Sequence, residues 1–352
     1  MAERRVFVFL DLVRGIAAIA VVLRHSSFYF PKLLPASHLA VDLFFILSGF
    51  VIAFAYQNRL IERLTWIEFT KVRWIRLYPV FLLGALLGAV WFVGQDIRDD
   101  GMVAKKSMAA ILLSFFMLPS PFSYNLYPTN GPSWSLFFEI LVNLLYAAIA
   151  KWLTIRVLIL VVIFSAAFLV IAAVYRQNTD IGFRWVHFYG GVARVCFGFF
   201  SGVLVYRAYA LGFRAPQLPA FLIIFAVIAI FGYSSLYCDL AKIFLLPLVV
   251  WFGASVHVVT PHFTKVSTFC GLISYPIYMI HVPVIRSSSE LLKHFVPNVS
   301  EVEKIVVGTI IVIAVVAVSY VVARYIDVPV RGMLTKIFRS KLADPAFSKK
   351  AH

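Results

Sequence analysis

The sequence predicts an all-α protein, a polytopic bundle of transmembrane helices, and three observations support this prediction. Of the 352 residues, 62% are hydrophobic and only 14% are charged, whereas a soluble domain carries about 25% charged residues. The mean hydropathy is +0.92. Apolar runs of roughly 17–25 residues, the length that crosses a bilayer, recur along the chain. Because no soluble fold of this size can bury so much apolar surface, lipid must be the solvent for much of it.

We place ten spans on the apolar runs, at about 6–24, 38–56, 77–94, 134–152, 155–175, 190–209, 216–233, 239–258, 268–286 and 303–326. An eleventh run, at about 107–118, is shorter than a comfortable span. We predict one short re-entrant or interfacial helix there, because a full crossing would move the C-terminal tail to the other side. The chain then divides into a membrane domain, 1–335, and a short basic cytoplasmic tail, 336–352.

The distribution of charge sets the orientation and excludes some partners. The net charge is +16, and the basic residues gather in a few loops and the tail, which is the pattern that membrane topology imposes. The positive-inside rule therefore predicts that both termini are cytoplasmic. A nucleic-acid-binding protein would instead present a soluble basic face, so no nucleic-acid partner is expected. The three cysteines show no metal-ligand spacing, and no metal is predicted.

The first span carries three polar residues of interest. Asp11 and Arg14 stand three apart, which allows a local ion pair, and a neutralised structural pair is the simplest interpretation. His25 follows Arg14 by eleven residues, so a continuous helix places both on one face about 16 Å apart. A histidine can act as a general base near neutral pH, although one at a helix end is commonly only interfacial. Asp42, near the external end of the second span, would suit an acid that orients such a base.

Two further groups of polar residues precede or open later spans. Arg73 and Arg76 share one side of a helix, and paired guanidiniums suit phosphate, although topological anchoring alone explains two basic residues there. Trp134 and Ser135 begin another span, and Glu139 follows inside it. A carboxyl at that depth is either functional or a hydrogen-bonded structural group.

A polar stripe marks the span at 268–286, where Tyr275, Tyr278 and His281 recur every three residues. An interfacial aromatic belt would give the same pattern. Further charged candidates inside apolar runs are Arg194 and an expected local pair, Asp239 and Lys242.

The topology predicts how these residues are distributed across the membrane. Four candidates fall toward the external ends of their spans, namely His25, Asp42, Glu139 and His281. Arg73 and Arg76 fall on the cytoplasmic side, with Arg14 between the two levels. We expect an outward-facing cluster of bases and carboxyls joined by one lined passage to an inward-facing anion site. A reagent with phosphates at one end and a reactive group at the other would fit.

In these residues the sequence resembles the acyltransferase-3 family of bacterial integral-membrane acyltransferases, over about residues 5–330. Arg14 and His25 resemble its Arg/Lys-x10-His signature, and Phe44 to Gly49 resembles its Phe-Phe-x-x-Ser-Gly element. Arg73, Arg76 and Pro79 are similar to its Arg-x-x-Arg-x-x-Pro element. Later landmarks are matched by Trp134, Ser135, Glu139 and the stretch from Ser274 to His281.

The resemblance implies a bacterial inner-membrane enzyme that moves an acyl group, usually acetyl, from cytoplasmic acetyl-CoA to a hydroxyl of an extracytoplasmic glycan such as O-antigen or exopolysaccharide. His25 would be the base or the acyl acceptor, supported by Arg14 and Glu139, and Asp42 is added to the catalytic candidates on its position alone. Arg73 and Arg76 would bind CoA. Substrate-binding residues would be Trp134, Ser135, Tyr275 and His281.

Two other functions fit the same features. A transporter or flippase for a glycan or lipid-linked substrate also has buried charge and a basic inner face, although no internal repeat is found here. A non-catalytic subunit of a membrane assembly would tolerate loss of Arg14 and His25.

Overall fold

The computed structural model describes residues 7–31, 33–98, 104–256, 260–296 and 298–343. Within these ranges the regular structure is entirely helical, apart from one isolated bridge between Asn125 and Arg184. The all-α prediction is therefore confirmed. Two parts of the topology prediction lie outside the described residues. They are Arg4 and Arg5, which place the N-terminus in the cytoplasm by the positive-inside rule, and residues 344–352 of the predicted tail.

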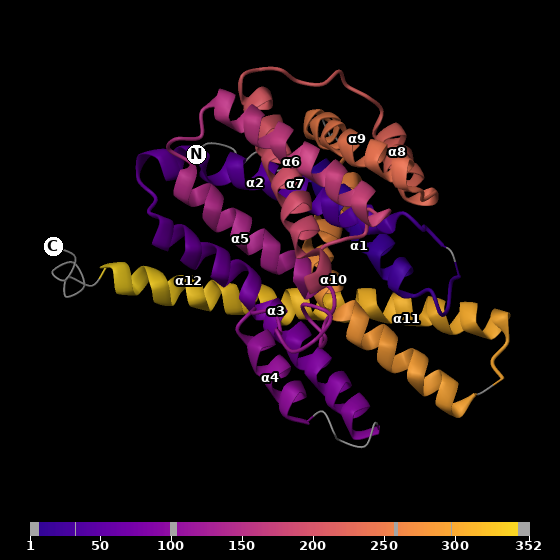
Figure 1. Ribbon diagram of the computed structural model, residues 1–352. Coiled ribbons are helices and arrows are strands. Elements are labelled where there is room, and N and C mark those ends of the chain that lie inside the picture. The colour runs from indigo at the N-terminus through magenta and orange to yellow at the C-terminus, as the bar shows by residue number, and fades with distance from the viewer. Residues whose placement is uncertain (1–6, 32, 99–103, 257–259, 297, 344–352) are drawn as a thin grey trace.

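Every predicted apolar run forms a helix (Figure 1). The α-helices are α1 (Val8–His25), α2 (Ala40–Glu62), α3 (Trp66–Arg98), α4 (Ala104–Phe115), α5 (Ser133–Ile149), α6 (Ile155–Arg176), α7 (Phe188–Ala210), α8 (Ala220–Gly232), α9 (Leu236–Ser255), α10 (Pro261–Phe295), α11 (Glu301–Val321) and α12 (Val328–Ala343). Short 3-10 turns, η1 (Ser37–Leu39) and η2 (Trp185–His187), precede α2 and α7.

The count of ten full spans needs correction. Among the described residues, seven helical segments are long and apolar enough to cross a membrane: those that contain α2, α3, α6, α7, α9, α10 and α11. The other three predicted spans fall short for physical reasons. α1 has 18 residues but includes two arginines and an aspartate. α5 and α8 have 17 and 13 residues, and thirteen residues rise only about 20 Å.

Three helices extend beyond their predicted ends. α3 begins at Trp66, so Arg73 and Arg76 are carried by the helix rather than by a loop. α10 continues to Phe295. α11 runs through the π-helical turn η3 (Val322–Asp327) into α12, and Figure 1 shows them as one long rod. The described part of the predicted tail is therefore helical, up to Ala343.

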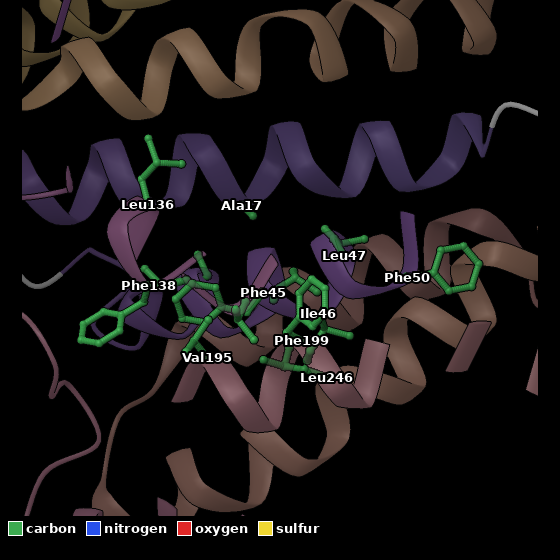
Figure 2. Close-up of a cluster of buried hydrophobic side chains, with 14 of the residues drawn as sticks. Ala17, Phe45, Ile46, Leu47, Phe50, Leu136, Phe138, Val195, Phe199 and Leu246 are labelled. Atoms are coloured by element: carbon green, nitrogen blue, oxygen red, sulfur yellow. The ribbon is translucent and has the colours of Figure 1, made fainter. Parts of the chain in front are cut away.

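The core forms where α2 packs against α7. Figure 2 shows Phe45 and Ile46 of α2 beside Phe199 of α7, with Phe50 further along α2, and all four side chains are at most 2% exposed. Two glycines permit this close approach. A Cβ on Gly49 would lie 1.9 Å from the Phe199 carbonyl oxygen, and one on Gly202 would lie 2.0 Å from that of Ile46. Small residues let membrane helices touch backbone to backbone, so Gly49 serves this contact.

Candidate active site

A polar cavity of about 180 Å³ lies among α1, α2, α3, α5 and α10. It is lined by three arginines, one glutamate and several hydroxyl groups, contributed by Arg14, Ser48, Arg73, Arg76, Ser135, Glu139, Ser274, Tyr275 and Tyr278, with apolar side chains between them. Charged groups at this depth in a bundle are costly unless they are paired, and they commonly mark a functional site. Six of the ten site residues predicted from the sequence are thus brought together: Arg14, Arg73, Arg76, Ser135, Glu139 and Tyr275.

Glu139 is the carboxylate at the centre of this cavity. Arg73 Nη2 donates a hydrogen bond to Glu139 Oε1 over 3.2 Å, and Ser48 Oγ donates to the same oxygen over 2.7 Å. The prediction that Glu139 joins His25 in an outward-facing cluster was therefore wrong. The early start of α3 explains the difference, because it carries Arg73 into the bundle, where the guanidinium requires a counter-ion.

Arg76 has a counter-ion that sequence reasoning missed. Its Nη1 lies 3.4 Å from Asp327 Oδ2, and Arg331 Nη2 lies 2.8 Å from the same oxygen. Asp327 is 1% exposed and closes the π-helical turn. The extra residue in a π turn rotates everything after it by about 100°. Asp327 lies just beyond the predicted end of the last span, beside basic residues that topology alone explains. Its position in the sequence therefore did not indicate that it is buried or that it pairs with Arg76.

The first helix carries the expected local pair, since Arg14 Nη1 lies 2.9 Å from Asp11 Oδ1. Both side chains are 25% exposed, and Arg14 lines the cavity. α1 also packs closely on α10, where a Cβ on Gly15 would lie 2.5 Å from Cys270 Cβ. This contact sets the two helices side by side, so that the last residue of α1 reaches the interior of α10.

There His25, the last residue of α1, and His281, inside α10, pack ring against ring, with centroids 5.0 Å apart. His281 is fully buried, whereas His25 is exposed. His281 Nδ1 lies 2.9 Å from the Ile277 carbonyl oxygen. A carbonyl can only accept, so Nδ1 carries the proton and Nε2 of the neutral ring is an acceptor. That Nε2 is buried and has no hydrogen-bond partner among the described residues.

The expected continuous passage between His25 and the arginines is interrupted. Neither His25 nor His281 lines the cavity. Tyr278 links the two regions, because it lines the cavity while its ring centroid lies 6.0 Å from that of His281. The Tyr278 hydroxyl is 2.7 Å from Ser135 Oγ, so α5 holds this tyrosine in place. Tyr275 of the predicted stripe instead donates to the Leu77 carbonyl oxygen over 2.5 Å.

Asp42 does not orient His25, which corrects a second expectation. Both its carboxylate oxygens accept from Arg194, with Nε to Oδ1 at 3.0 Å and Nη2 to Oδ2 at 2.8 Å. Arg194 is fully buried and also donates to the carbonyl oxygens of Ile181 and His38. Trp134, predicted to bind substrate, is 7% exposed and lies 5.3 Å from the Arg194 guanidinium, outside the cavity lining.

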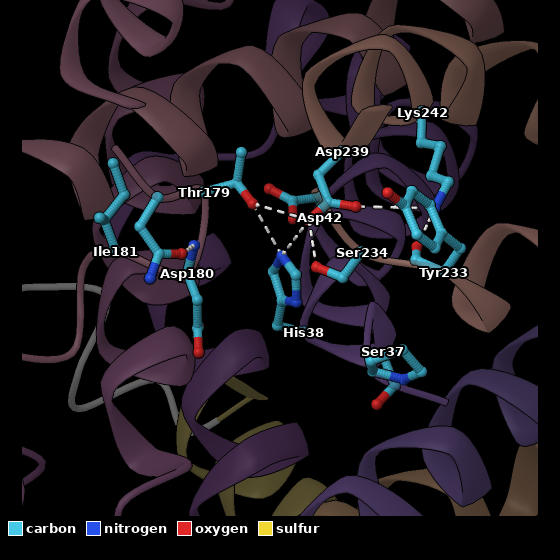
Figure 3. Close-up of polar contacts among 12 residues, drawn as sticks. Ser37, His38, Asp42, Thr179, Asp180, Ile181, Tyr233, Ser234, Asp239 and Lys242 are labelled. Carbon is cyan, nitrogen blue, oxygen red and sulfur yellow. Dashed lines mark hydrogen bonds and ion pairs between the residues drawn. The ribbon is translucent and has the colours of Figure 1, made fainter. Parts of the chain in front are cut away.

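A network of polar side chains continues from this pair and joins the segments before α2, α7 and α9 (Figure 3). His38 Nε2 is 2.8 Å from Thr179 Oγ1 and 3.5 Å from Asp239 Oδ2. Asp239 also pairs with Lys242 at 3.6 Å, as expected. No local motif identifies His38, because its partners lie more than a hundred residues away.

Asp180 anchors the loop before α7 to the end of α1. Its Oδ2 accepts from Arg24 Nη2 over 2.6 Å, next to His25 in the chain. Burial alone would raise the pKa of Asp180, but the neighbouring His38, Arg24 and Arg194 outweigh burial and hold it below its usual value. Across the described residues, no group of three histidine, cysteine or acidic side chains could hold a metal ion.

Fold and site together define a polytopic membrane protein with a charged cavity inside its helix bundle. Comparison with known families is more specific: the acyltransferase-3 family, described as an acyltransferase domain, matches residues 7–324. The chain belongs to this family and is a membrane acyltransferase. It is also 38% identical over 183 residues to "Protein 2 in picA locus" from Rhizobium radiobacter, which covers 47% of this chain and 94% of that protein. No solved structure matches the chain.

Proposed function

We propose that the protein transfers an acyl group, acetyl in the simplest case, from cytoplasmic acyl-CoA to a hydroxyl of an extracytoplasmic glycan, in a bacterial inner membrane. One observation supports this most directly. A cavity containing Arg14, Arg73 and Arg76 lies on one side of Tyr278, and the His25–His281 pair lies on the other. This arrangement suits a donor whose charged end and reactive end are far apart.

The donor phosphates would bind at Arg73 and Arg76. Guanidiniums form strong, charge-assisted hydrogen bonds to phosphate. The Arg76 side chain is 39% exposed, so an anion can reach it from outside the cavity. Arg73 and Arg76 already pair with Glu139 and Asp327, so the phosphates would replace these carboxylates as partners of the two guanidiniums. The thioester would then extend toward Tyr278.

The chemistry would take place at His25. Its imidazole would remove the proton from the acceptor hydroxyl as the oxygen attacks the thioester carbonyl. The carbon–sulfur bond then breaks, and the leaving thiolate takes the proton from the imidazolium, giving an ester and free CoA. In the alternative route the His25 nitrogen first takes the acyl group, CoA leaves as the thiol, and the glycan hydroxyl attacks the acyl-imidazole. General-base assistance contributes about 10²–10⁴-fold.

The test is acyl transfer in proteoliposomes with labelled acetyl-CoA and bacterial surface glycan. His25→Ala should reduce transfer by at least about 100-fold. His294→Ala is the matched control, because His294 is an exposed histidine at the end of α10 and should leave the rate unchanged. Wild-type activity in the His25→Ala protein, at equal expression, would refute the proposal. Glycan uptake without any acetylation would instead favour a transporter.

A further inference from the structure

A group of polar residues lies beside the two histidines, outside the donor cavity. Arg286 of α10 stacks over the indole of Trp91 of α3, with the guanidinium carbon 4.9 Å from the ring centroid. Arg286 is exposed and lies close enough to His25 and His281 for their charges to interact. The arginines of the cavity each pair with a carboxylate. Arg286 forms no ion pair with any residue in the described ranges.

The loop before α5 is fixed against the same two helices. Pro283 has no N–H, so the carbonyl oxygen of Met279, four residues earlier, lacks its helical donor. Asn130 Nδ2 supplies the missing bond over 2.8 Å and also donates to the Gly84 carbonyl oxygen over 3.2 Å. The backbone next to Asn130 presses on α3, where a Cβ on Gly88 would lie 2.6 Å from the Thr129 oxygen.

This arrangement leaves four buried polar atoms without partners among the described residues: Trp91 Nε1, Thr129 Oγ1, Asn130 Oδ1 and His281 Nε2. The residues are neighbours in the fold, because Trp91 follows Gly88 by one turn on α3 and His281 follows Met279 on α10. Thr129 and Asn130 are 1% exposed, and His281 is fully buried. Unsatisfied buried groups are rare and call for a partner. The indole N–H donates, the amide oxygen and the imidazole nitrogen accept, and the hydroxyl does both.

We infer that Trp91, Thr129, Asn130 and Arg286 form the acceptor subsite, and that this subsite takes a sugar unit bearing a negative charge. Sugar hydroxyls both donate and accept, which matches the mixture of unpartnered atoms. Arg286, held in place by the indole, binds a carboxylate or phosphate on the sugar. The nearby exposed His25 then faces a hydroxyl of the same unit. This inference rests on the proposed function and narrows its substrate class to acidic glycans.

The test uses purified protein in nanodiscs, acetyl-CoA, and three acceptors with one backbone. The first carries a uronic acid, the second a sugar phosphate, and the third is the neutral, carboxyl-reduced form. Arg286→Gln should raise the acceptor KM for the charged sugars about tenfold to a hundredfold, as expected for a lost charge-assisted hydrogen bond. It should leave the KM for the neutral sugar and for acetyl-CoA unchanged. The uronate and phosphate arms identify which anion is recognised.

Lys293→Gln is the matched control, since it removes one positive charge from the exposed surface of the same helix, and all KM values should stay at the wild-type level. Equal KM values for charged and neutral sugars in the wild type, or a charged-sugar KM unaffected by Arg286→Gln, would overturn the inference while leaving acyl transfer intact. If the wild type acetylates no acceptor, the proposed function fails. Calorimetric binding of the uronic acid oligosaccharide then decides the subsite, and equal affinity for wild type and Arg286→Gln would overturn it.

Discussion

The ring of His25, the last residue of α1, contacts the ring of His281 inside α10, and of the two only His25 is open to solvent. His281 is fixed by its bond to the Ile277 carbonyl, and it in turn limits where the His25 ring can lie. In the proposed mechanism His25 would therefore carry out the chemistry, and His281 would position it.

This division predicts the effect of His281→Phe, which keeps an aromatic ring of similar shape and removes both ring nitrogens. The kcat should fall about tenfold, comparable to the loss of one hydrogen bond, and the KM for acetyl-CoA should not change. Steady-state kinetics in proteoliposomes measures both. A tenfold rise in the donor KM with unchanged kcat would contradict a positioning role.

Asp42→Asn tests whether Asp42 is structural. The change removes the closer of the two carboxylates beside the fully buried Arg194 guanidinium and leaves only Asp180, 3.9 Å away, which should cost up to about 3–5 kcal/mol of stability. Thermal unfolding in detergent, monitored by size-exclusion chromatography, should show a large drop in the unfolding temperature. The fraction that remains folded should keep its activity per molecule. An Asp42→Asn protein of wild-type stability that is inactive would instead restore Asp42 to the catalytic machinery.

The Asp327–Arg331 pair should contribute to donor binding through Arg76. Arg331→Gln removes one cation beside the phosphate site, and the KM for acetyl-CoA should rise about three- to tenfold, within the range for hydrogen bonds to charged groups. Arg324→Gln, on the exposed side of the same π-helical turn, should leave the KM unchanged. Acetyl-pantetheine, which lacks the nucleotide phosphates, should be used equally well by both variants. Equal acetyl-CoA kinetics in the two variants would refute a role for Arg331.

Gly49→Ala tests the contact between α2 and α7. The new methyl would overlap the Phe199 carbonyl oxygen, so the helices must separate, at a cost of about 1–3 kcal/mol or more. Gly94→Ala on α3, where a Cβ meets nothing within 4 Å, should be neutral or slightly stabilising because alanine favours helix. The measurement is the midpoint of thermal unfolding, and similar midpoints for the two variants would contradict the packing argument.

Patterns along the chain predicted the helices well, because the apolar runs and the cost of unpaired backbone in lipid leave few alternatives. The local pairs Asp11–Arg14 and Asp239–Lys242 also followed from spacing alone. Long-range pairing did not, because a buried charge selects its partner by helix packing. No residue pattern near Asp42 predicts Arg194 as its partner, and none near Arg76 predicts Asp327.

The level at which each site residue lies along the bundle was also harder to predict than which residues belong to the site. Six of the ten predicted site residues line the cavity, yet Glu139 was placed at the wrong level and the passage to His25 was expected to be open. Both errors follow from reading helix ends off hydropathy, since α3 starts well before its apolar run begins.

Each of the three guanidiniums in the cavity already has a carboxylate beside it: Asp11 for Arg14, Glu139 for Arg73 and Asp327 for Arg76. The charges that surround the cavity are thus close to balanced, which lowers the cost of placing three guanidiniums inside the bundle. If the cavity is the donor site, as we propose, the phosphates of acyl-CoA would compete with these carboxylates for the guanidiniums. The same carboxylates would then help to displace CoA after the acyl group has left.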